Sequence, residues 1–193
     1  MSQETQKKFE SVGYTPSHVA NYFIFRAKQE KVTDLTVMKL LKLVYIGYAW
    51  SLAALNKKLF DEPIEAWAYG PVVPSLYHEF KYRGQANIDR YSDIVDIDIN
   101  HRMTLTEPHI EDTEHLTVLN AVWQTYKQDD AFNLSDTLHQ KNNAWHQAYT
   151  KGKNHPLNDA AIYERACAEI NAISKDICKI NKATLSRENI DYM

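Results

Sequence analysis

Residues 37–56 read VMKLLKLVYIGYAWSLAALN, and this stretch decides the fold class. Apolar side chains recur every three or four residues, which is the spacing of one face of an α-helix. Further apolar residues widen that face, and only Lys39 and Lys42 interrupt a nearly all-round apolar surface. A helix of this composition is normally buried on all sides. We therefore expect it at the centre of a helical domain.

Further helices are predicted on both sides of this stretch. Thr15-Pro16 is typical of a helix start, with the threonine as cap and the proline at the first helical position, and this helix should end near Glu30. Later helical patterns cover residues 74–82, 107–133, 133 or 134 to 139, 145–149 and 159–182. The predicted fold class is mainly α, a single helical domain with a minor short β-hairpin-like element.

The strand signals are short. Residues 64–69 predict one strand, which Gly70 and Pro71 should end, and residues 152–156 predict a loop. For residues 94–99 and 103–106, strand and loop stay equally open. We expect a flexible lead over residues 1–15, the domain over 16–165, and a C-terminal helix extension and tail over 166–193, with the last ten residues frayed.

Composition narrows the class of protein. The chain has 193 residues, a net charge of −3 and mixed charge signs, which argues against binding to a nucleic acid backbone. It has no long apolar run and a polar N-terminus, so neither a membrane span nor a signal peptide is expected. Cys167 and Cys178 would lie about 16 Å apart on one helix, too far for a disulfide. We expect reduced thiols and a cytoplasmic protein.

The known motifs of metal and phosphate chemistry are missing. His78-Glu79 begins like a metalloprotease motif, but Tyr82 takes the position of the second histidine. His139 and His146 would lie about 10 Å apart on one rigid helix, too far to share a zinc ion, although a kink at Asn142-Asn143 would bring them closer. No glycine-rich phosphate loop occurs. We predict no metal, no cofactor and no catalytic residues.

Two polar features have more than one interpretation. The adjacent carboxylates of Asp61 and Glu62 suit acid–base work or cation binding, but a turn before Pro63 is favoured. Lys39 and Lys42 should need partners on so apolar a helix, with Glu65 or Glu79 as candidates, unless both lysines reach solvent.

Residues 60–80 read FDEPIEAWAYGPVVPSLYHEF, which combines aromatic side chains with proline and glycine turns. Rigid aromatic side chains suit an interaction surface, and they suit equally a tight turn whose rings fill the core. This stretch resembles the hallmark segment of the Panacea domain, known from SocA-like antitoxins and from phage and mobile-element proteins. The family's three sub-patterns are matched in full at residues 60–67, 69–74 and 77–80.

The resemblance extends over residues 17–165. Before the hallmark segment, Thr36 and the run KLLKLVY at residues 39–45 match the family's helix. After it, the agreement is weaker: Val122, Trp123, Tyr126, Leu134 and Ser135 match, whereas the family's Thr-His pair appears as Leu138-His139 and its Pro-Trp pair as Ala144-Trp145.

The resemblance implies an antitoxin that binds a cognate protein toxin, with no established catalytic residues. The alternatives are a phage or mobile-element protein that targets a host factor, and a hydrolase using carboxylate and histidine groups. The oligomeric state stays open. We expect partner-binding or fold-signature roles for Lys39, Lys42, Tyr45, Asp61, Glu62, Trp67, Tyr69, Gly70, Pro71, Tyr77, His78, His139 and Trp145.

Overall fold

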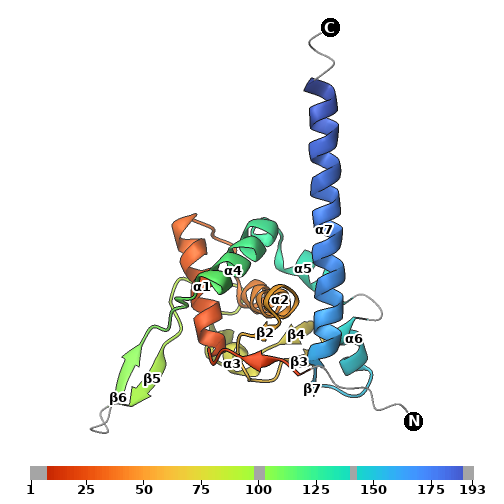
Figure 1. The fold of residues 1–193 in the computed structure, drawn as a ribbon. Coiled ribbons are helices and arrows are strands. Elements are labelled where there is room, and N and C mark those ends of the chain that lie inside the picture. The colour runs from red at the N-terminus through yellow and green to blue at the C-terminus, as the bar shows by residue number, and fades with distance from the viewer. Residues whose placement is uncertain (1–7, 98–102, 140–142, 189–193) are drawn as a thin grey trace.

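A central helix, α2 (Val37–Leu55), organises the fold. The computed structural model describes residues 8–97, 103–139 and 143–188, with the side chains of the last helix described as far as Lys175. Residues 39–52 of α2 are all buried. Around this helix pack α1 (Pro16–Gln29), α4 (Thr113–Tyr126) and α7 (Asp159–Glu188) (Figure 1). The prediction of a mainly α fold is confirmed.

The ends of the first two helices follow from local chemistry. Helix α1 begins at Pro16 as predicted, and the ring nitrogen Nδ1 of His18 accepts a hydrogen bond from the Thr15 N–H at 3.1 Å. Helix α2 begins after Thr36, whose hydroxyl accepts from the Lys39 N–H. It ends at Asn56, which adopts the left-handed conformation that commonly closes a helix.

Helix α2 is long and apolar enough to cross a membrane by length and composition alone. However, 83% of its most apolar window is buried inside the protein. Such burial identifies α2 as the core helix of a folded domain, because a membrane span would present its apolar side chains to lipid.

The described residues also form three small sheets. Strand β1 (Glu10–Ser11) runs parallel to β2 (Lys57–Lys58). Strand β3 (Glu65–Trp67) lies between β4 (Gly70–Val72) and β7 (His155–Pro156), and both pairings are antiparallel. Strands β5 (Ile94–Ile97) and β6 (Met103–Thr106) form a hairpin that extends away from the helices (Figure 1).

The sheets contradict two predictions and decide the choice between strand and loop that the sequence left open. Gly70 and Pro71 do not end the strand region, because they form β4 and turn back along β3. The predicted loop at residues 152–156 contains β7, which pairs with the distant β3. The choice between strand and loop is decided for strand at residues 94–97 and 103–106, whereas residues 98 and 99 lie outside the described residues.

The predicted helix over residues 107–133 is wrong in its boundaries. Helix α4 starts only after Asp112, whose carboxylate accepts from the His115 N–H at 3.0 Å. A second helix, α5 (Ala131–Leu138), begins after Asp130, whose carboxylate accepts from two backbone N–H groups at 2.8 Å each. Two capping aspartates therefore divide the segment. Helix α6 (Ala144–Tyr149) follows.

The N-terminal end of the described chain attaches to the body. Phe9 is buried and its ring lies 5.5 Å from that of Tyr163 on α7. Residues 1–7 of the expected flexible lead lie outside the described residues. Helix α7 is continuous across residues 165 and 166, so the division into domain and extension stays a prediction.

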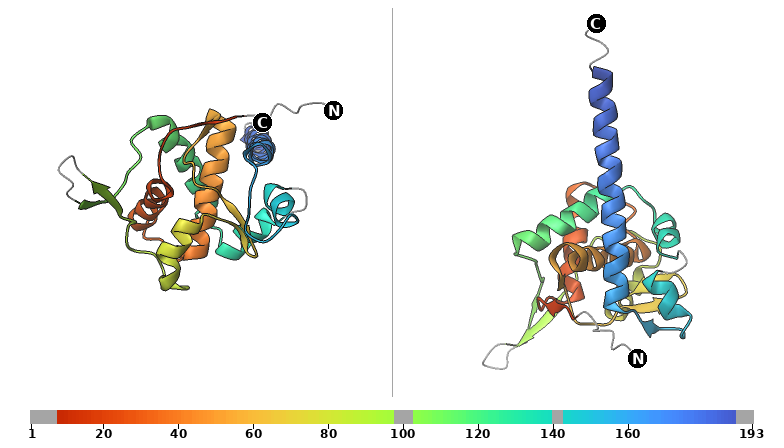
Figure 2. Two further views of the ribbon diagram at one scale, coloured as in Figure 1. Left: turned by 90° about the horizontal axis from the view of Figure 1, so that it is seen from below. Right: turned by 45° about the vertical axis from the view of Figure 1, so that its right-hand side comes forward.

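The last helix is longer than predicted. It continues to Glu188, past the expected end at Lys182, so residues 184–188 are helical, and residues 189–193 lie outside the described residues. Its C-terminal part extends away from the rest of the protein (Figure 2). Cys167 is a free thiol, as expected for its position on a continuous helix.

Candidate functional site

The hallmark segment folds back on itself beside the central helix. Strands β3 and β4 form a tight hairpin, because Trp67 pairs with Gly70 across only two turn residues. Gly70 has φ +102°, which L-residues rarely adopt. Helix α3 (Pro74–Phe80) follows, with Pro74 at its start, and a short 3-10 turn, η1 (Lys81–Arg83), continues it.

An open pocket of about 770 Å³ lies between this hairpin, helix α3 and the first half of α2. Its size falls in the range typical of ligand sites, roughly 300–1,000 Å³. Four predicted site residues meet here: Lys42, Trp67, Tyr69 and Tyr77. The other lining residues are Val37, Met38, Leu41, Ala68, Val72, Lys81, Gly84, Gln85, Tyr149, Lys153 and Asn154.

Aromatic side chains shape one wall of the pocket. The Trp67 and Tyr77 rings meet edge to face, with centroids 4.9 Å apart. Trp67 is half-buried, and its indole N–H donates to the Glu65 carboxylate at 2.8 Å. Tyr69 in the hairpin turn is 72% exposed. Trp67 therefore packs against the core and Tyr69 faces solvent, while a role for these aromatics in binding stays a prediction.

His139 and Trp145 support the hairpin from behind. Their rings make an edge contact at 4.2 Å, and the Trp145 indole N–H donates to the Trp67 carbonyl at 2.8 Å. Ser135 donates to the Tyr69 carbonyl at 3.2 Å. Burial lowers the pKa of His139, and the nearby Lys42 charge lowers it further. These residues position the hairpin and are not part of the pocket lining.

The two lysines of α2 are both buried, but they differ in their partners. The Lys39 ammonium donates to the Asp34 carboxylate at 2.9 Å and to the Lys127 carbonyl at 2.8 Å. The Lys42 ammonium donates to the Pro71 carbonyl at 3.2 Å. In the part of the chain that the structure describes, no carboxylate forms an ion pair with Lys42. Burial lowers the pKa of Lys42 to about 7.

The expected lysine partners are wrong. The Glu65 carboxylate accepts from the Trp67 indole N–H, and that of Glu79 accepts from the Ser92 hydroxyl at 2.8 Å. Burial raises the pKa of Glu79. The alternative that both lysines reach solvent is also wrong, since Lys39 is 0% and Lys42 1% exposed.

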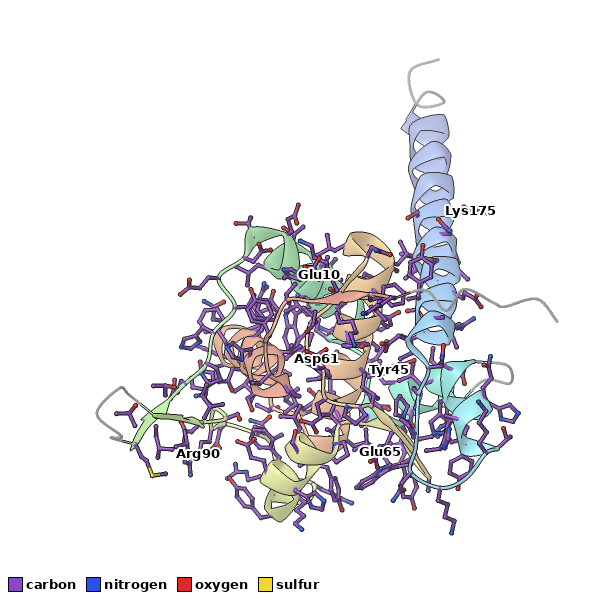
Figure 3. The ribbon with its side chains drawn as sticks, turned by 60° about the horizontal axis from the view of Figure 1, so that its bottom comes forward. Glu10, Tyr45, Asp61, Glu65, Arg90 and Lys175 are labelled. Atoms are coloured by element: carbon purple, nitrogen blue, oxygen red, sulfur yellow. The ribbon has the colours of Figure 1, made fainter. Side chains whose placement is uncertain are left out.

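The remaining predicted residues lie away from the pocket. Tyr45 lies on α2 beside α7 (Figure 3) and is buried. Its pKa is raised first by burial and then by the Glu169 charge. His78 is exposed, 3.3 Å from the Lys81 ammonium. Lys39 also lies outside the lining, and Pro71 contributes only its carbonyl contact to Lys42.

The Asp61-Glu62 pair serves local structure. Asp61 forms an ion pair with Lys58 at 3.3 Å, and Glu62 accepts from the Ser75 N–H at 3.1 Å. The Ser75 N–H is one of the free donors in the first turn of α3, so Glu62 stabilises that helix start. Within the described ranges, no group of three or more His, Cys, Asp or Glu side chains is placed to hold a metal ion.

Sequence reasoning missed two of the pocket's lysines, Lys81 and Lys153, and its far wall. Lys81 directly follows the hallmark segment and continues its last helical turn, which was a usable signal. Tyr149 and Lys153 come from α6 and the approach to β7, much further along the chain. No local pattern indicates that this region returns to β3.

We expect Lys42→Met to stabilise the protein, by about 1–3 kcal/mol near pH 6, after subtracting the lost hydrogen bond to Pro71. The folded pKa of about 7 lies below the ordinary 10.5, so the folded state binds this proton more weakly than the unfolded chain. Wild-type stability should therefore rise relative to the variant as pH increases from about 7 toward 10.5. Urea unfolding at several pH values measures the difference. A difference that does not change with pH would contradict the assigned shift.

No curated protein and no solved structure matches the chain. A family model described as the antitoxin SocA-like, Panacea domain matches residues 40–146. That range holds most of α2, the β3–β4 hairpin, α3 and the supporting helices α4 and α5. Since it is more than half of the 193 residues, the chain belongs to the SocA-like antitoxin family with a Panacea domain.

Proposed function

We propose that this protein is the antitoxin of a toxin–antitoxin pair and that it neutralises its toxin by direct protein–protein contact in the cytoplasm. Membership of the SocA-like antitoxin family carries the proposal. The toxin is a protein, and the antitoxin acts by binding rather than by catalysis. The positions of Asp61 and Glu62 support this choice, because both carboxylates are engaged in local contacts outside the pocket.

The hairpin β5–β6 offers a contact surface for the toxin. Val95 pairs with Leu105, and Met103 lies two residues before Leu105 on the same face of its strand. The side chains of Val95, Leu105 and Met103 are 54%, 70% and 71% exposed, respectively. Apolar side chains grouped in this way on a projecting element are typical of protein interaction sites. The hairpin lies inside the family's matched range and extends from the body, where a partner can reach it (Figure 1).

We expect the double change Met103→Ser and Leu105→Ser to weaken toxin binding by about tenfold or more, because each buried apolar side chain contributes roughly 1–3 kcal/mol to an interface. The melting temperature should change little, since both side chains are exposed. Phe132→Ser, at another exposed apolar side chain on α5, is the matched control. Titration calorimetry with the purified toxin measures the effect. Unchanged affinity would place the toxin elsewhere on the surface.

The proposal is tested by growth of cells that express the neighbouring open reading frame, with and without this protein. Arrest by the neighbour alone and recovery on co-expression are the expected results. If the neighbour is harmless, the toxin pairing fails for this locus, and the alternative of a phage or mobile-element protein directed at a host factor takes its place.

A further inference from the structure

The pocket beside the hallmark hairpin has an unusual charge balance. Three of its lining residues are lysines, Lys42, Lys81 and Lys153, and none of the residues that line it is acidic. This occurs in a chain whose net charge is −3. The remaining lining is mainly aromatic and aliphatic, with Trp67 and Tyr77 among the rings. Such a lining suits a ligand that combines an apolar body with a negative group.

Lys42 provides the second observation. Its side chain is 1% exposed and belongs to the pocket wall, and it donates to one carbonyl, that of Pro71. An ammonium has three N–H donors and no acceptor, so a single carbonyl partner leaves N–H donors available for a ligand. A buried cation is costly unless a negative group compensates it. Burial lowers the pKa of Lys42 to about 7.

Lys39 shows how the same helix compensates a buried lysine internally. Three residues earlier, its ammonium has both a carboxylate, from Asp34, and a carbonyl, from Lys127. Lys42 has the carbonyl but, among the described residues, lacks the carboxylate. Gly70 lets the Lys42 ammonium approach the hairpin backbone closely, since a Cβ there would lie 2.7 Å from Nζ. The described part of the chain thus keeps a buried cation in the wall of the pocket without an acidic side chain beside it.

We propose that this pocket binds a carboxylate attached to an aromatic or aliphatic body, with the carboxylate paired to Lys42 and the body against Trp67 and Tyr77. Lys42 is buried in the pocket wall, where the attraction between opposite charges is stronger than in bulk water. Lys81 and Lys153 are exposed and attract the anion to the pocket mouth. The carboxylate belongs either to a free small molecule or to a peptide segment of the toxin.

The first experiment uses the full-length protein alone, so its result does not depend on the toxin proposal. 3-Phenylpropionate is titrated while the Trp67 indole N–H signal is followed by NMR, and its uncharged amide, 3-phenylpropionamide, is titrated in parallel. We expect millimolar binding of the acid and at least about tenfold weaker binding of the amide. Equal binding of the two, or no binding of the acid up to about 20 mM, overturns the proposal.

Two lysine variants complete the test. Lys42→Met should lose at least about tenfold in affinity for 3-phenylpropionate, whereas Lys39→Met, at the internally paired lysine, should retain wild-type affinity. The melting temperature of each variant shows that it is folded. Equal affinity of the wild type and a folded Lys42→Met variant overturns the proposal. Lys42→Gln is a second variant for the same comparison if Lys42→Met does not fold.

A second arm identifies the source of the carboxylate. If it comes from a toxin segment, 3-phenylpropionate competes with the toxin, and Lys42→Met weakens toxin binding. If the carboxylate comes from a free small molecule, neither 3-phenylpropionate nor Lys42→Met changes toxin binding. The Lys42→Met variant still has a lower affinity for 3-phenylpropionate. Both results support binding of a carboxylate in this pocket. Each result also identifies whether that carboxylate belongs to the toxin or to a small molecule.

Discussion

Gly70→Ala is expected to lower the free energy of unfolding by about 2–4 kcal/mol. Gly70 has φ +102°, a conformation that strains any residue with a Cβ. The added methyl group would also lie 2.7 Å from the Lys42 ammonium, which is held by the Pro71 carbonyl. Either the hairpin or the lysine must move, and both belong to the pocket. Urea unfolding measures the loss.

Gly13→Ala is the matched control for this prediction. Gly13 also has a positive φ, +81°, but a Cβ added there would have no atom within 4 Å. We expect a loss of only about 1 kcal/mol for this variant, from conformation alone. Equal losses for the two variants would mean that the close approach of Lys42 to Gly70 contributes nothing to stability.

Trp123→Ala is expected to destabilise the protein by about 3–5 kcal/mol. Trp123 is fully buried on α4, and its indole N–H donates to the Glu30 carboxylate at 2.8 Å. Arg26 and Lys127 also donate to Glu30, each at 2.8 Å. These three donors, led by Lys127, lower the pKa of Glu30 to about 2. The tryptophan thus fills the core and completes a polar contact between α1 and α4.

Trp123→Phe separates these two contributions. It keeps most of the ring packing but removes the N–H donor, so a smaller loss of about 1–2 kcal/mol is expected. Chemical unfolding of both variants at neutral pH measures the pair. A Trp123→Phe loss as large as that of Trp123→Ala would show that the contact with Glu30, rather than ring volume, dominates at this position.

Helices were predictable where the deciding chemistry is local. The apolar surface of α2 and the Thr15-Pro16 start of α1 are both contained in a few adjacent residues, and both predictions are confirmed. The helix starts within residues 107–133 also depend on local residues, because Asp112 caps α4 and Asp130 caps α5. Apolar periodicity on both sides of Asp130 concealed the break.

Long-range contacts account for what the sequence did not reveal. Strand β7 has only two residues, and it forms because it pairs with the edge of β3 that β4 leaves free. One of the two partners of Lys39 is likewise set by the packing of α4 against α2, which brings the Lys127 carbonyl to the ammonium. Aromatic composition and a family pattern indicated the hairpin side of the pocket, but nothing local indicated that Tyr149 would face it.

Direct contact between antitoxin and toxin is the central claim, and co-purification of the two proteins tests it most directly. The neighbouring open reading frame is co-expressed with this protein, and the purified material is analysed by size-exclusion chromatography with light scattering. A complex of defined mass containing both chains is the predicted result. Recovery of growth with the two chains eluting separately would contradict neutralisation by binding.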